Sequence, residues 1–187
     1  MRKIVVTEYV SLDGVAEAPN TFVTEWDDLV DAKIPEVIGT QDAVILGRRS
    51  YDDWVQFWPD SQIEPFATFI NGVAKFVATS TPLDAPWAHS TAIDGDLVAF
   101  VDDLRRKPGG DIGVHASLSV AQTLLIAGLV DELRLVVAPC VAGGGRRLFD
   151  GVPGVRLEVI RSQTSPTGYL LVDYRVLAAS PEVGEEI

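Results

Sequence analysis

The chain is poor in residues that bind metals or form disulfides: its 187 residues include one cysteine, Cys140, and two histidines, His89 and His115. A single thiol cannot form an intrachain disulfide, so the cysteine content leaves the redox compartment open. These residues also cannot build a Cys/His zinc site with the usual spacing, which excludes the zinc-deaminase signature. We therefore predict a protein without a metal site.

Basic residues are scarce as well. The chain has 15 lysines and arginines against 27 aspartates and glutamates, a formal net charge of −12. Proteins that bind the nucleic-acid backbone carry a basic face, so no nucleic-acid partner is expected. A local pair such as Arg48 and Arg49 can still hold a small anionic ligand.

Long hydrophobic runs are missing. The longest, Leu124 to Val130, is far shorter than the roughly 20 residues that a membrane span requires. The N-terminus begins like a signal peptide, but Thr7 and Glu8 interrupt its apolar stretch and no small-residue cleavage site follows. We predict a cytoplasmic protein with no membrane partner.

Several common catalytic motifs are absent. The sequence has no G-x-S-x-G elbow and no G-x-x-x-x-G-K-[ST] phosphate loop. The Gly143–Gly145 run lacks the continuation of the common dinucleotide fingerprint. A nucleotide site, if present, must therefore be built from other segments.

Apolar residues make up 47% of the chain, enough for one core, and strand-like and helix-like segments alternate over its first two thirds. The helix between the first two strands contains Pro35, which should kink or split it. We also expect a helix starting at Ser50, with Asp53 bonding back. The expected strands are Lys3–Val10, Ala43–Leu46, Lys75–Ala78 and Ile112–Val114, and the further helices are about Leu97–Arg106 and Ser117–Ala127.

The last third has no helical pattern between its strands, expected at Glu132–Val141, Val155–Thr164 and Tyr169–Leu177, and Ser165 to Gly168 reads as a hairpin turn. The prediction is one α/β domain over residues 1–177, with a mostly parallel mixed sheet, helices on both faces and a C-terminal antiparallel hairpin. Residues 178–187 form an acidic tail.

The segment LGRRSY, Leu46 to Tyr51, has the pattern of a buried strand followed by a helix start. A helix N-terminus suits a phosphate, and the guanidinium groups of Arg48 and Arg49 match phosphate oxygens. Taken alone, the hexapeptide favours a plainer interpretation, in which Ser50 caps a helix and both arginines are solvated.

Two further strand ends carry small or hydroxyl residues. Thr79 and Ser80 follow a strand and precede Pro82, as ordinary turn residues also do. The segment VHASLSV leads from a strand through Ala116 and Ser117 into a helix N-terminus at Leu118. Small residues at several strand ends are typical of the ligand-binding rim of an α/β sheet.

The ordered series SLDG, LGRRSY, KFVATS, VHASLSVAQTLLIAGLVDEL and GGGRRLF resembles the dihydrofolate-reductase-like fold. It is most similar to stand-alone relatives of the reductase domain of riboflavin biosynthesis, and the resemblance extends from Arg2 to about Val176. It implies the three-layer fold of that family and NADPH as the cofactor.

The resemblance also implies roles for individual residues. Gly47 to Ser50 takes the place of the turn that holds the NADPH phosphates, with Arg48 at the 2′-phosphate and Arg49 and Ser50 at the pyrophosphate. Thr79 and Ser80 lie beside the 2′-phosphate. Ala116, Ser117 and Leu118 replace a turn that usually reads Gly-Ser or Gly-Gly, and alanine tolerates a positive φ poorly.

At the reacting end, the resemblance lays the SLDG loop over the nicotinamide, with GGGRRLF (Gly143 to Phe149) against it. Asp13 then faces the substrate and could donate or relay a proton, ahead of Asp27 and Asp28; its plainer interpretation is a turn residue before Gly14. Trp54 and Phe57 are expected in the core, and Trp58 could face a planar substrate.

The predicted function is an NADPH-dependent reductase of a small planar heterocycle or another C=N or C=O compound. The alternative is a non-catalytic nucleotide-binding or sensor protein, which Ala116 keeps open. We expect a homodimer, because Leu133–Val137 and the Val155–Leu177 hairpin are apolar for a sheet edge.

Overall fold

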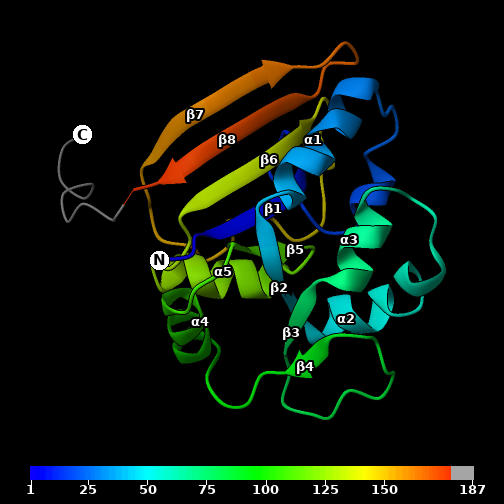
Figure 1. The fold of residues 1–187 in the computed structure, drawn as a ribbon. Coiled ribbons are helices and arrows are strands. Elements are labelled where there is room, and N and C mark those ends of the chain that lie inside the picture. The colour runs from blue at the N-terminus through cyan, green and yellow to red at the C-terminus, as the bar shows by residue number, and fades with distance from the viewer. Residues whose placement is uncertain (178–187) are drawn as a thin grey trace.

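In the computed structural model, which describes residues 1–177, one mixed sheet of eight strands runs through the molecule (Figure 1). The strand order is β4-β3-β2-β5-β1-β6-β8-β7. The strands are β1 (Ile4–Ser11), β2 (Gln41–Gly47), β3 (Ala74–Ala78), β4 (Ser90–Ala92), β5 (Asp111–His115), β6 (Glu132–Ala138), β7 (Leu157–Thr164) and β8 (Leu170–Val176).

Strand β1 lies inside the sheet and pairs in parallel with β5 and β6. Strands β2, β3 and β4 continue the parallel part, whereas β8 runs antiparallel to both β6 and β7. Ile4, Val5 and Val6 are fully buried, as expected for a strand covered on both faces. The predicted mixed sheet and its C-terminal antiparallel hairpin are confirmed.

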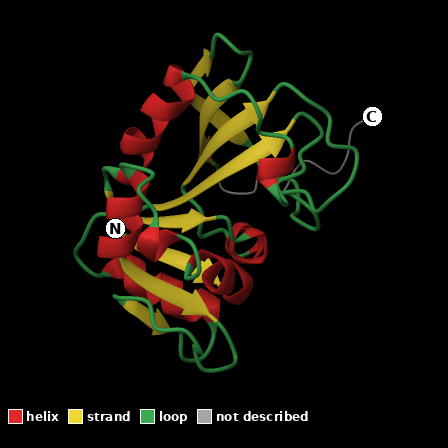
Figure 2. Cartoon of the chain, turned by 90° about the vertical axis from the view of Figure 1, so that its right-hand side faces the viewer, coloured by secondary structure: helices red, strands yellow, loops and turns green. Residues whose placement is uncertain are grey.

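Helices cover both faces of this sheet (Figure 2). Val101 of α4 and Leu118 of α5 pack in one apolar cluster with Ile4 and Val6 of β1. Val30 of α1 packs with Val136 of β6 in a second cluster, and the short helices α2 and α3 contribute to a third. The helices are α1 (Asp28–Ile38), α2 (Arg48–Trp54), α3 (Phe66–Gly72), α4 (Leu97–Arg106) and α5 (Leu118–Ile126), with 3-10 turns at Pro19–Thr21 and Trp58–Asp60.

Two helix predictions are corrected by the structure. The split expected as one of two outcomes at Pro35 does not occur: α1 runs through Pro35 as a single helix and is capped by Asp27, whose carboxylate accepts from the N–H groups of Leu29 and Val30. Helix α2 begins at Arg48 rather than at Ser50. The Ser50 hydroxyl donates to the carbonyl of Ala116 instead of capping, so a tertiary partner overrides the local capping pattern.

The structure differs from the sequence-based predictions in three further ways. Neither α3 nor the short strand β4 was predicted. Phe57 is 52% exposed and so lies outside the core. The segment Leu133–Val137 is not at an edge, because β6 lies between β1 and β8. The edge strands are β4 and β7, and the residues of β7 are all exposed. The acidic tail, residues 178–187, lies outside the described residues.

Candidate functional site

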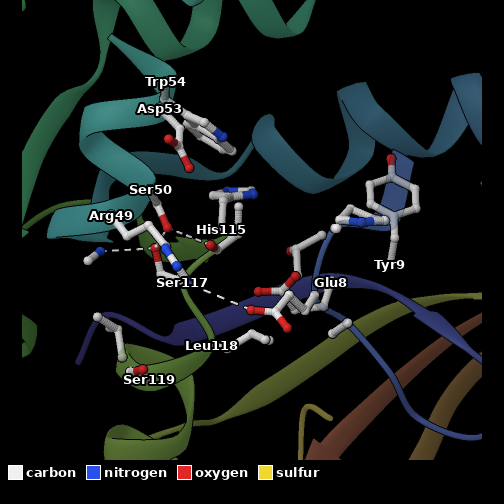
Figure 3. Close-up of a pocket in the computed structure, with 18 of the residues that line it drawn as sticks. Glu8, Tyr9, Arg49, Ser50, Asp53, Trp54, His115, Ser117, Leu118 and Ser119 are labelled. Atoms are coloured by element: carbon white, nitrogen blue, oxygen red, sulfur yellow. Dashed lines mark hydrogen bonds and ion pairs between the residues drawn. The ribbon is translucent and has the colours of Figure 1, made fainter. Parts of the chain in front are cut away.

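A cavity of about 1200 Å³ opens where the parallel strands β1, β2 and β5 end (Figure 3). Parallel strands bring their carboxyl ends to one edge of a sheet, and ligands of open α/β sheets bind in the crevice there. Walls come from β1, β5, β6, from α1, α2 and α5, and from the loops after β1, α2 and β6. The predicted residues Gly47, Arg48, Arg49, Ser50, Trp58, Ala116, Ser117 and Leu118 all line this cavity.

The turns after β2 and β5 are joined by hydrogen bonds through Ser117. Its Oγ accepts from the backbone N–H of Gly47 at 2.9 Å and donates to Ser50 Oγ at 3.0 Å. Ser50 Oγ in turn donates to the carbonyl oxygen of Ala116 at 2.6 Å. The two segments that the sequence placed at the cofactor phosphates therefore form one continuous wall.

Helix α5 presents an open N-terminus to this wall. Its first backbone bond runs from Ala121 N–H to the Ser117 carbonyl, and the Ser117 side chain does not cap the helix. The amides of the first turn are therefore available to an anion. Ala116, just before it, has φ 49°, so alanine occupies the left-handed conformation that glycine adopts without strain.

Arg48 and Arg49 have different surroundings. Arg48 Nε bonds the Asp52 carboxylate at 2.8 Å, Nη2 bonds Asp84 at 2.5 Å, and Nη1 bonds Thr81 and the Pro82 carbonyl. Every guanidinium nitrogen of Arg48 thus has a partner. The Arg49 side chain is 77% exposed and has one ion pair, with Glu17 at 3.6 Å.

Thr79 and Ser80 lie beside the main cavity rather than in it. They line a neighbouring depression of about 740 Å³, which shares Ala78 and Leu97 with the main cavity. Thr79 Oγ1 is bonded within its own turn, to the carbonyl and N–H of Thr81. Because Arg48 bonds the Thr81 side chain, the structure does bring Arg48 and this turn together.

Asp13 has a different setting from the predicted one, because it does not line the cavity. Its carboxylate accepts from Ser11 Oγ at 2.6 Å and from the backbone N–H groups of Ala142 and Gly143 at 2.9 and 3.0 Å. These hydrogen bonds, the one from Ser11 first, lower the pKa of Asp13 to about 2. Asp13 is therefore ionised at neutral pH and joins two loops.

The predicted contact between the SLDG loop and the GGGRRLF segment is confirmed. The Leu148 N–H donates to the Gly14 carbonyl at 3.0 Å, and Val15 forms an antiparallel bridge with Arg147. Asp27, the alternative proton donor, caps α1 and accepts from the Thr167 hydroxyl at 2.6 Å, so it too has a structural role.

Glu8 is a cavity residue that the sequence did not single out. It lies on the buried strand β1, is 4% exposed, and contributes to the cavity wall. Its Oε1 atom is buried without a hydrogen-bond partner. Burial raises the pKa of Glu8 to about 8, an effect that the backbone N–H of Ser117 only partly offsets.

His115 forms part of the opposite wall and is neutral. Its Nε2 lies 2.8 Å from Gln41 Oε1, and its ring contacts those of Phe66 and Phe69 edge-on. Burial, with a smaller contribution from Arg134, lowers its pKa to about 4. A buried, neutral imidazole held in this way belongs to the wall, in line with the prediction of a packed residue.

An aromatic group closes the side of the cavity beyond α2. Trp58 lies 4.8 Å from Phe66 and 5.8 Å from Trp54 between ring centroids, and all three line the cavity. Across from them, the rings of Tyr9 and Trp26 lie 5.2 Å apart between centroids, tilted by 40° to each other. Such walls suit a planar ligand.

The sequence did contain a signal for Glu8, since it is the one charged residue in an otherwise apolar and hydroxyl stretch, Ile4 to Ser11. A carboxyl group in a strand buried on both faces needs a partner or a function. What the sequence could not show is that β5 and β6 flank this strand and that a cavity opens at its end.

Comparisons with known proteins show what the chain and its fold are similar to. The chain is 28% identical to the uncharacterized protein YyaP of Bacillus subtilis over 92% of its own length and 94% of that protein. A crystal structure from Shewanella, named as a riboflavin biosynthesis protein, superposes with a TM-score of 0.75 at 21% identity, covering 94% of this chain and 99% of that one. The Thermotoga maritima diaminohydroxyphosphoribosylaminopyrimidine deaminase/5-amino-6-(5-phosphoribosylamino)uracil reductase superposes at 0.68 and 16% identity, covering 94% of this chain and 57% of that one. Because the family model of the RibD C-terminal domain matches residues 2–171, the chain belongs to the RibD C-terminal domain family.

Proposed function

We propose that the protein is an NADPH-dependent reductase that transfers a hydride to a C=N or C=O bond of a small planar heterocycle. The observation that carries this proposal is a single cavity with two chemically different ends. One end has the open N-terminus of α5, with Arg49 and the buried carboxyl group of Glu8, and the other has aromatic walls. A phosphate-bearing cofactor and an apolar ring suit these two ends.

The residues present fit a dinucleotide. The cavity, about 1200 Å³, exceeds the roughly 300–1000 Å³ of ordinary small-ligand sites. The amides of Leu118 and Ser119 and the guanidinium of Arg49 would hold the pyrophosphate, with Ser50 and Ser117 shaping the wall. When bound, NADPH would supply the hydride.

Selection of NADPH over NADH rests on Arg48, Thr79 and Ser80. A 2′-phosphate at Arg48 has to displace the Asp84 carboxylate, whose side chain is 84% exposed. An exposed ion pair of this kind contributes little, about 0–1 kcal/mol, so a doubly charged phosphate can replace it.

The protein's own contribution is orientation and exclusion of water. Trp58 and Phe66 would hold a planar substrate against the end of β1. On the α1 side, Lys33 is held by Asp173 at 2.6 Å and Arg134 by Glu132 at 3.0 Å, and both cations reach the cavity. These fixed charges would favour a substrate with polar substituents on its ring.

Isothermal titration calorimetry with NADPH and NADH tests the cofactor. Binding of NADPH, followed by loss of its absorbance on adding a pterin, a pyrimidine or a quinone, supports the reductase. Absence of binding to either nucleotide refutes it.

A second candidate is a nucleotide sensor without turnover, favoured by the strained Ala116 at the cofactor turn. Binding of NADPH without oxidation by any of these acceptors would favour this candidate.

A further inference from the structure

Glu8 occupies a position where a carboxyl group is costly. It is nearly as buried as the valines around it, yet its Oε1 has no hydrogen-bond partner among the described residues, and the group that favours its charged form is the backbone N–H of Ser117. An unpartnered polar group in such a place costs about 1–3 kcal/mol. The preceding residue, Thr7, contributes the other buried side-chain atom on the cavity wall, Oγ1, that has no hydrogen-bond partner among the described residues.

The pleat of β1 determines what Glu8 faces. Thr7 is in register with His115 of β5 and Arg134 of β6, and residues in register point to the same side of a sheet. Glu8 points to the other side, where Val6 and Val10 pack against α5. The titratable groups of β5 and β6 near the cavity thus lie on the far side of the sheet from Glu8.

The remaining charged groups near Glu8 do not favour its ionised form. Helix α5, which packs on the same side, contains no charged residue. On the adjoining loops, Glu17 is paired with Arg146 at 2.9 Å and with Arg49 at 3.6 Å. The pKa of the Tyr9 hydroxyl is raised by burial first, and then by the nearby Asp31 and Glu8. Within residues 1–177 no cation is paired with this carboxyl group, and the backbone N–H of Ser117 at the start of α5 only partly offsets the cost of burying its charge.

We propose that Glu8 is the proton donor of the reduction, carried as a neutral carboxylic acid at the end of β1. This inference rests on the proposed reductase function. Hydride from NADPH forms a C–H bond at the carbon of C=N or C=O, and the π electrons move to the nitrogen or oxygen. The Glu8 O–H bond breaks as its proton forms the N–H or O–H bond, which leaves NADP⁺, the reduced substrate and the Glu8 carboxylate. Water returns the proton to Glu8.

This assignment accounts for three observations together. The acid has no acceptor on the protein, so its O–H is available to a ligand. It lines the same cavity as the aromatic residues that can hold a ring, and it does so from the α5 side of β1. Its pKa of about 8 keeps the proton on at neutral pH, near the range in which a general acid is most effective. Asp13, with a pKa of about 2, does not hold a proton there.

The first test needs neither cofactor nor substrate. Infrared difference spectra between the natural protein and Glu8→Gln at pH 7 should show a protonated carboxyl band, which converts to a carboxylate band as the pH rises past about 8. Glu132→Gln is the matched control, because Glu132 is a buried but ionised glutamate paired with Lys3 and Arg134. A carboxylate band for Glu8 at pH 7 overturns the proposal.

The second test measures turnover with NADPH and either 7,8-dihydropterin or 1,4-naphthoquinone as the acceptor. Glu8→Gln should lower kcat by about 10²–10⁴-fold with little change in NADPH affinity, and Glu8→Asp should retain part of the activity. In the natural protein kcat/KM should fall above pH 8.

The outcomes separate this proposal from the function on which it rests. Full activity of Glu8→Gln overturns the role of Glu8 and leaves the reductase intact. Failure of the natural protein to bind NADPH refutes the reductase and the proton-donor role with it, whatever the infrared spectra show.

Discussion

The carboxylate of Asp13 accepts a 2.9 Å hydrogen bond from the backbone N–H of Ala142, 129 residues further along the chain. This bond, with its neighbour at Gly143, fastens the loop after β1 to the loop after β6. The same two loops are joined again at Gly14 and Leu148. Asp13 therefore acts on the border of the cavity through the loops it connects.

Asp13→Asn distinguishes this role from that of a proton donor. An asparagine keeps the turn but loses the charged acceptor, so we expect a lower melting temperature and a kcat reduced less than about 10-fold. Because the native pKa of Asp13 is lowered, its stabilisation is present above the unfolded value and is lost as the pH falls from 3.8 towards about 2. The melting-temperature difference between the two proteins should shrink over that interval. A fall in kcat of about 10²–10⁴-fold would instead support the role predicted from the sequence.

Glu8 should give the stability of the protein the opposite pH dependence. Its native pKa, about 8, lies above the ordinary value of 4.5, so the unfolded chain releases the proton first as the pH rises. Stability should be full below pH 4.5 and decline between pH 4.5 and 8, by at most about 1.4 kcal/mol per pH unit. Urea unfolding across this interval checks the slope, which Glu8→Gln should flatten. An equal slope in both proteins would show that other groups cause it.

Ala116→Gly should stabilise the protein. The left-handed backbone conformation costs an L residue about 1–2 kcal/mol in the folded state, and glycine avoids this cost. The greater conformational freedom of glycine in the unfolded chain opposes this gain by about 0.4–1 kcal/mol. We expect a net gain of roughly 0.5–1 kcal/mol in urea unfolding. Ala127→Gly is the control, because Ala127 has φ −75° and should only lose stability. Destabilisation by both changes would contradict the strain argument.

Nucleotide preference should respond to the partners of Arg48. Arg48→Ala should remove most of the preference for NADPH over NADH, which we expect to be about 10–100-fold. Asp84→Asn should raise NADPH affinity by up to about 5-fold and leave NADH unaffected, because it frees Nη2 of Arg48. Calorimetry measures all six dissociation constants, for three proteins and two nucleotides. Equal affinity of the natural protein for both nucleotides would refute the 2′-phosphate assignment.

We propose that two chains pair along β7 to form a homodimer. This edge strand exposes Val159 and Ile160, by 56% and 46%, and an unpaired apolar edge tends to be covered. Light scattering at micromolar concentration should give twice the chain mass, and Ile160→Lys should give a monomer. Ile126→Lys, at an isoleucine that is 57% exposed on α5, should leave the dimer intact. A monomeric natural protein would refute the pairing.

The features that could be predicted from the sequence are those set by neighbouring residues, and the others depend on contacts between distant parts of the chain. Alternating strands and helices were predictable because their apolar periodicity extends over many residues, as in α4 and β1. The start of α2 was not, since the Ser50 hydroxyl is bound by Ala116, 66 residues away. The cavity residues of the turns after β2 and β5 followed from motifs and from the resemblance. Glu8 is the one charged residue between Ile4 and Ser11, but only the sheet order shows that it lies between two strands at a cavity.

Ser117 Oγ links the two turns of the cavity wall, and this link has a consequence for how the site can change. Removing the Ser117 hydroxyl leaves the Gly47 N–H and the Ser50 hydroxyl without this partner, and removing the Ser50 hydroxyl takes away the acceptor of Ser117. Residues that share a partner are energetically coupled, so their effects do not add. The two turns therefore behave as one unit: under the proposed function, we expect a change of nucleotide preference at one of them to require an accommodating change at the other.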